Sequence, residues 1–139
     1  MKIFLKTEDE IELMRSANQL VGRTLAELYK FVRPGITTLQ LDRIAEEFIR
    51  DNGAVPTFKN FPNPFGKPFP ASICTSVNNV VVHGIPDNLT ELRDGDVISI
   101  DCGTLFAGFN GDSCYTFRVG EIKPEVEQLL RVTKESLYK

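Results

Sequence analysis

Apolar residues recur at helical spacing near the start of the chain. From Ile11 to Val32 they return every three or four positions, which is typical of a helix with one buried face. Thr7 and Glu10 form the capping-box pattern that begins a helix, and Pro34-Gly35 is a pattern that ends one. The sequence therefore predicts a long amphipathic helix before residue 34.

A second helical pattern follows immediately. Thr37 and Gln40 repeat the capping box, and the stripe from Leu41 to Ile49 has the same three- and four-residue spacing. Gly53 is placed for a C-terminal cap. These features predict a shorter amphipathic helix that ends before residue 53.

From residue 54 the pattern changes to that of strands. Several segments are short, β-branched and bounded by turn residues, and the last two form a predicted hairpin across Ala107-Gly108. The predicted strands are residues 54–58, 71–77, 80–82, 97–106 and 109–119. Pro124 then begins a last helix with apolar positions up to Leu137. The order of elements predicts an α+β fold, a mostly antiparallel sheet with helices on one face.

Composition narrows the functional classes. The 139 residues suit a single domain, 1–139, and 42% hydrophobic residues can form its core. The net charge of −3 disfavours nucleic acid as the primary partner. No apolar run approaches the ~20 residues of a membrane span, and the apolar run at the start of the chain is too short for a signal peptide. We therefore expect a cytoplasmic protein without a membrane partner.

The three cysteines, Cys74, Cys102 and Cys114, are far apart in the sequence and form no CxxC pair. Their spacing argues against a disulfide framework and against a structural zinc site. For most of them we expect the role of a small buried hydrophobic residue.

His83 is the only histidine of the chain. It lies between a β-branched segment and a Gly/Pro turn, so its ring is expected at the edge of the sheet, where catalytic groups are often placed. A purely structural histidine is the alternative interpretation at this point.

Asp101 and Asp112 form a second candidate site. Asp101 interrupts an apolar strand, where a carboxylate is costly unless a cation or donors satisfy it. With a two-residue loop at 107–108, the residue numbers of any two facing residues add up to 215. Asp101 therefore faces Cys114, and Asp112 faces Gly103. The two aspartates are then diagonal neighbours on one face, roughly 7–8 Å apart at the backbone. One or two divalent cations would relieve their repulsion. A plain turn role for Asp112 remains open.

The loop of residues 59–70 is rich in proline and aromatic residues. With the residue before it, this segment carries four phenylalanines close to Cys74: Phe58, Phe61, Phe65 and Phe69. So many phenylalanines in a loop would expose a large apolar area unless they line a pocket or pack over the core. Both interpretations remain open on this evidence.

Taken together, these segments resemble the methionine aminopeptidase family over nearly the whole chain. The strongest matches are the runs from Cys74 to Pro86, from Asp94 to Asp101, and Asn110-Gly111-Asp112. The His-Gly-Ile-Pro form at residues 83–86 is similar to the type I branch. Several ordered motifs at matching spacing are much more specific than any one of them. The resemblance implies one half of the pita-bread fold, in which two similar halves are related by a pseudo-twofold axis.

The resemblance also assigns roles to residues. Asp101 matches an aspartate that binds one of two divalent metals (Mn, Fe, Co or Zn), and Asp112 matches one that bridges both. His83 matches a histidine that hydrogen-bonds the substrate and binds no metal. The pocket for the methionine side chain is expected at Phe58, Phe61, Phe69 and Cys74. The backbone around Asn78 and Val80 matches a monovalent-cation site.

The implied activity is the removal of the first methionine from nascent polypeptides near the ribosome. Two features depart from the family pattern: an extra segment at residues 62–68, and the absence of the second half that carries the remaining ligands. We therefore expect a fragment that is inactive alone and that pairs as a homodimer. The alternatives are a non-catalytic binding module and an Xaa-Pro-directed peptidase. The large domain that precedes the fold in Xaa-Pro relatives has no room before Thr7.

Overall fold

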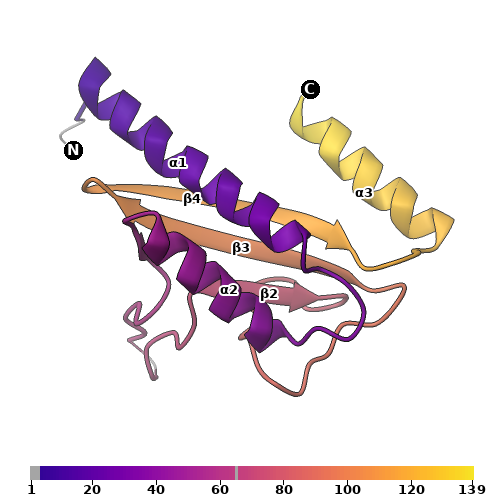
Figure 1. The fold of residues 1–139 in the computed structure, drawn as a ribbon. Helices are drawn as coiled ribbons and strands as arrows, with labels where there is room; N and C mark the ends of the chain where they lie inside the picture. The colour runs from indigo at the N-terminus through magenta and orange to yellow at the C-terminus, as the bar shows by residue number, and fades with distance from the viewer. Residues whose placement is uncertain (1–3, 65) are drawn as a thin grey trace.

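The computed structural model describes residues 4–64 and 66–139 and shows a sheet with two helices packed on one face (Figure 1). The elements, in chain order, are α1 (Glu8–Tyr29), α2 (Thr38–Asp51), β1 (Val55–Pro56), β2 (Ile73–Val77), β3 (Val97–Phe106), β4 (Phe109–Arg118) and α3 (Pro124–Leu137). The predicted α+β class with an antiparallel sheet is confirmed.

Both capping boxes are present. The Thr7 hydroxyl accepts from the backbone N–H of Glu10, and the Glu10 carboxylate accepts from that of Thr7. Thr37 and Gln40 form the same reciprocal pair at the start of α2. The apolar stripe predicted helix up to Val32, but α1 ends at Tyr29. Pro34 disfavours helical geometry before it, and Val32 packs against the core from the connecting turn instead.

β3 is the central strand of the sheet. It pairs with β1 and β2 along one edge and with β4 along the other, always antiparallel. The hairpin turns at Ala107 and Gly108, which have φ values of 50° and 85°, the left-handed geometry of a tight two-residue turn. Asp101 pairs with Cys114 and Gly103 with Asp112, so the predicted register is confirmed.

Three predicted strands are wrong in extent. Residues 80–82 form no strand, although they are all valine, because the free edge of β2 is occupied by Gly84 instead, whose carbonyl accepts from Thr75 N–H at 2.8 Å. The segment 54–58 pairs only at Val55–Pro56, and 71–77 only from Ile73. These two segments are therefore strands only over the residues that pair with β3.

The two faces of the sheet differ in chemistry. Ile98, Ile100 and Cys102 of β3 point toward α1 and α2 and are fully buried in the core. Because side chains alternate along a strand, Ser99, Asp101 and Gly103 point to the opposite face. We call this second face, which α1 and α2 do not cover, the open face.

α3 differs from the other helices because none of its residues is buried. It is tied to β4 by an Arg118–Glu127 ion pair at 3.4 Å and by Lys134, whose amino group lies 5.8 Å from the centre of the Tyr115 ring. In Figure 1 it stands apart from the sheet. No helix in the described part of the chain is long and apolar enough to cross a bilayer.

Candidate functional site

The open face gathers the predicted site residues on three neighbouring strands. Cys74 of β2, Asp101 of β3 and Cys114 of β4 form one row across the sheet. Asp112 lies two residues from Cys114 on the same strand, so its side chain is on the same face. The structure thus brings together the two carboxylates that the sequence singled out.

The two carboxylates influence each other electrostatically. The pKa of Asp101 is raised, first by burial, then by the negative charge of Asp112 and by a hydrogen bond between the two side chains. An electrostatic interaction with His83 acts in the opposite direction and lowers the pKa of Asp101. Two adjacent carboxylates with a raised pKa are a donor set suited to a divalent cation.

The raised pKa of Asp101 predicts a pH-dependent cost to stability. The ionised form is disfavoured in the fold, so stability is fully present below the ordinary pKa of 3.8 and falls as pH rises through the folded value. Asp101→Asn is expected to stabilise the metal-free chain at pH 7 by about 0.5–2 kcal/mol, and the gain should vanish in acid. Urea unfolding across pH, with Glu47→Gln as an exposed control, measures it. A gain that grows in acid would contradict the sign.

His83 lies at the outer edge of β2, as predicted, although not at the end of a strand. Its own φ is 58°, in the left-handed region. The next residue, Gly84, bonds to β2 twice: its carbonyl accepts from Thr75 N–H, and its N–H donates to the Ser76 hydroxyl at 3.2 Å. His83 is therefore held beside the open face by a backbone connection to β2.

Gly84 is needed for this connection. A Cβ at this position would lie 2.1 Å from the Thr75 carbonyl oxygen, which is backbone and cannot move aside cheaply. We expect Gly84→Ala to destabilise the chain by about 1–3 kcal/mol and to displace His83. Gly22→Ala in α1 is the matched control, because nothing lies within 4 Å of its added Cβ. Equal unfolding midpoints for the two variants would contradict this role.

The residues predicted to line a methionine pocket differ in burial, and the pocket itself stays a prediction. A Cβ at Gly103 would lie 2.2 Å from Thr57 Oγ1 and 2.7 Å from Phe58 Cε1, so Phe58 packs directly on the open face beside Asp112. Cys74 is only 4% exposed. Phe69 is half-buried, whereas Phe61 is 64% exposed. Phe65 lies outside the described residues.

Backbone hydrogen bonds close the aromatic loop at its base. Asn60 N–H donates to the Phe69 carbonyl at 2.8 Å, and Phe69 N–H donates to the Phe61 carbonyl at 3.0 Å. These bonds bring the backbones of Phe61 and Phe69 together. Residues 62–68, which the resemblance predicts to be an extra segment, are therefore flanked by a closed backbone base.

The cysteines have poorly ionised thiols. Burial, followed by the charge of Asp101, raises the pKa of Cys74 and of Cys102 to about 12. Both are buried, which confirms the expectation for most of the cysteines, whereas Cys114 is exposed. Its pKa is also raised by partial burial and by the two aspartates.

The proposed monovalent-cation segment lies in the turn after β2. Asn78 has a φ of 52°, and its side chain links the turn to β3 by accepting from Val97 N–H at 3.1 Å and donating to Asp96 at 2.9 Å. Val80 N–H donates to the Val77 carbonyl. The turn is thus well anchored, and a cation there remains a prediction.

A hydroxyl pair on the open face was not singled out from the sequence. Ser99 Oγ and Thr116 Oγ1 lie 2.8 Å apart, two facing pairs along the hairpin from Asp101 and Cys114 and on the same face. The predicted hairpin register could have located this pair, because the residue numbers 99 and 116 also add up to 215. These hydroxyls extend the polar surface next to the two carboxylates.

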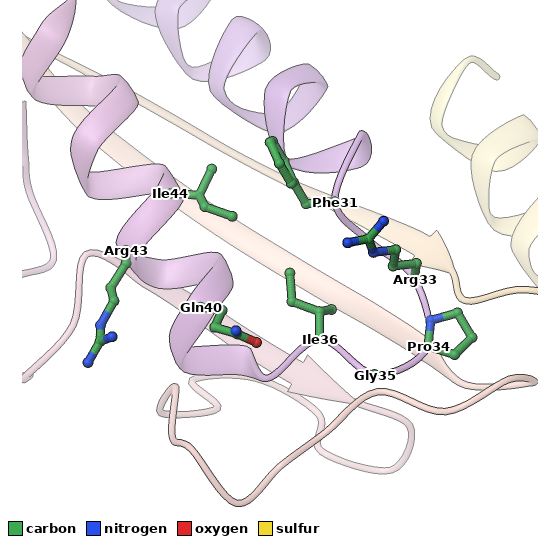
Figure 2. Close-up of a pocket in the computed structure, with 8 residues that line it drawn as sticks. All are labelled: Phe31, Arg33, Pro34, Gly35, Ile36, Gln40, Arg43 and Ile44. Atoms are coloured by element: carbon green, nitrogen blue, oxygen red, sulfur yellow. The ribbon is translucent and has the colours of Figure 1, made fainter.

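Other features of the surface lie away from this site. The hollow in Figure 2 lies between α2 and the segment that connects α1 to α2, and its lining includes Phe31, Arg33, Ile36, Arg43 and Ile44. Among residues 4–64 and 66–139, no group of three or more His, Cys, Asp or Glu side chains is arranged to hold a metal ion. Two carboxylates alone would supply the protein ligands here.

Adjacent carboxylates on the open face of an antiparallel sheet are a donor set suited to the divalent metals that metallohydrolases use. The family model of metallopeptidase family M24 matches residues 12–139, and the chain belongs to this family. The methionine aminopeptidase of Clostridium perfringens is 55% identical over 137 residues, which are 99% of this chain and 53% of that protein. The chain therefore spans about half the length of the curated relatives it matches.

Solved structures confirm the fold as one half of the pita-bread architecture. Methionine aminopeptidase from Rickettsia prowazekii superposes with a TM-score of 0.91 at 35% identity, over 99% of this chain and 53% of that one. An Xaa-Pro dipeptidase from Bacillus anthracis reaches a TM-score of 0.73 at 22% identity, over 89% of this chain and 32% of that one. The second similarity shows the common fold alone.

Proposed function

We propose that this chain supplies the aspartate half of a two-metal aminopeptidase that removes the N-terminal methionine from nascent polypeptides in the cytoplasm. The observation that carries the proposal is that the Asp101 and Asp112 carboxylates lie side by side on the open face, next to His83 and Phe58. The similarity to a methionine aminopeptidase at 55% identity supports this substrate over the Xaa-Pro alternative. A non-catalytic module would have no need for a costly carboxylate pair.

Each residue then has a role in the reaction. Asp101 would hold one divalent metal, and Asp112 would bridge two. When bound, the metals supply Lewis-acid activation of water and of the scissile carbonyl. His83 would donate a hydrogen bond to the substrate near the scissile amide and stabilise the charge that develops there.

Phe58 and Cys74 would bind the methionine side chain. Phe58 packs on Gly103, which faces Asp112 across the hairpin, so an apolar side chain beside that ring lies close to the two carboxylates. An apolar pocket of this kind discriminates by only about 1–3 kcal/mol per methylene. Preference for methionine over shorter aliphatic side chains should therefore be moderate.

Complementation tests the proposed function. The 139-residue chain, co-expressed with the C-terminal half of the Clostridium perfringens methionine aminopeptidase, is expected to hydrolyse Met-Ala-type peptides in the presence of Mn²⁺. Each half expressed alone is the control. A soluble, assembled pair without turnover at any metal concentration would contradict the proposal, and preferential cleavage before proline would favour the Xaa-Pro alternative.

We also propose that the chain by itself pairs with a second copy through β4. Because Asp112 N–H points to the outer edge, Cys114, Thr116 and Arg118 also point their N–H groups outward. The Asp112 N–H is already bonded to Asn18, but antiparallel pairing of two such edges can place Cys114 opposite Thr116 of the second copy, and unpaired edges favour association. Sedimentation should show a dimer at high micromolar concentration that Thr116→Pro abolishes. A strict monomer would contradict this.

A further inference from the structure

Three contacts attach one turn of α1 to the hairpin at Asp112. Gly111 packs so closely that an added Cβ would lie 2.5 Å from the Ala17 carbonyl oxygen and 2.8 Å from Asn18 N. The buried Thr104 hydroxyl donates to the same Ala17 carbonyl at 3.2 Å. Residues 104 and 111 are a facing pair of the hairpin. α1 and the β3–β4 hairpin are therefore packed against each other at the residue immediately before Asp112.

The third contact is made by a side chain. Asn18 Oδ1 accepts from the backbone N–H of Asp112 at 3.3 Å, across 94 positions of sequence. Asn18 Nδ2 donates to the Met14 carbonyl at 2.9 Å, which fixes the direction of the amide group. The Asp112 N–H points away from β3, so no strand of this sheet satisfies it. Asn18 takes the place of a neighbouring strand at this one residue.

We propose that Asn18 is a positioning residue for Asp112: it holds the edge of β4 so that the Asp112 carboxylate stays beside Asp101 in the geometry that a shared divalent cation requires. This inference rests on the proposed function. The physical reason is that an edge strand moves more freely than a central one, whereas a bridging carboxylate must be held closely. Outer contacts that orient metal ligands commonly affect metal affinity.

Asn18 is suited to substitution. It is exposed on α1, and alanine is a better helix former than asparagine, so Asn18→Ala should keep the fold. Asn18→Asp keeps an oxygen acceptor for Asp112 N–H but adds a charge. The neighbouring exposed residue Gln19 offers matched controls: Gln19→Ala tests helix propensity, and Gln19→Glu tests the added charge without the hydrogen bond.

The experiment combines two NMR measurements on the 139-residue chain. Amide exchange of Asp112 without metal reports the hydrogen bond, and paramagnetic broadening by Mn²⁺ at the Asp101 and Asp112 amides reports cation binding. Asn18→Ala should accelerate exchange of the Asp112 amide and weaken Mn²⁺ binding about tenfold. Asn18→Asp keeps the acceptor but loses the donor to the Met14 carbonyl, so it should lie between Asn18→Ala and the unmodified chain in both measurements, and Gln19→Ala should match the unmodified chain.

The outcomes separate the inference from the proposed function. If the unmodified chain shows Mn²⁺ broadening and Asn18→Ala binds equally well, the positioning role is wrong while the metal site stands. If Gln19→Glu gains as much affinity as Asn18→Asp relative to their alanine variants, charge explains the effect and the role is again wrong. If the unmodified chain shows no broadening at either aspartate, the proposed metal site fails, and the positioning role fails with it.

Discussion

Asp101→Asn and Asp112→Asn are expected to abolish metal binding and peptidase activity in the complemented enzyme, whereas His83→Ala should keep the metal and lose most of the rate. The reason is the division of roles on the open face. The two carboxylates interact directly, but His83 approaches from the edge of β2. Loss of one hydrogen-bond donor to a developing charge typically costs about 10²–10³ in rate.

Calorimetric metal titration and steady-state kinetics on the three variants measure this division. Asp51→Asn is a suitable control, because it makes the same chemical change at an exposed position at the end of α2. If His83→Ala lost the metal, the histidine would be a ligand and our role assignment would be wrong. If Asp112→Asn retained full affinity, the bridging role would be wrong.

The 139-residue chain alone is expected to show no peptidase turnover above background. Within the part of the chain that the structure describes, no group of three or more potential ligands could hold a metal ion. A cation held by two carboxylates alone is bound weakly. The measurement is hydrolysis of Met-Ala-type peptides at saturating Mn²⁺.

A parallel preparation of Asp101→Asn reveals contaminating host enzyme, because a contaminant would give equal rates in both samples. Robust Mn²⁺-dependent turnover by the unmodified chain, lost in Asp101→Asn, would show that half of the fold suffices for catalysis. That result would overturn the proposed division of the active site between two halves.

Local signals predicted most of the fold. The capping boxes at Thr7 and Thr37 act within four residues, so they could be located from sequence alone. The hairpin register followed from one turn, because antiparallel pairing fixes every facing pair once the loop is known. That register alone predicted that Asp101 and Asp112 lie on one face.

Interactions between distant segments could not be predicted in this way. The valines at 80–82 have strand propensity, but the edge they would need is taken by Gly84. The contact between Asn18 and Asp112 depends on how α1 lies across the hairpin, which no local pattern encodes. The closed base of the aromatic loop likewise depends on a pairing between Asn60 and Phe69 that the proline-rich composition conceals.

The closed base of this loop has a practical consequence for protein engineering. Because the bonds among Asn60, Phe61 and Phe69 are made by backbone atoms, they do not depend on which side chains follow. Lengthening a loop beyond such a base costs little, about 0.6 kcal/mol for each doubling. Residues 62–68 are therefore a natural insertion point for an affinity epitope or a fluorescent label, which would leave the backbones of Phe61 and Phe69 in place.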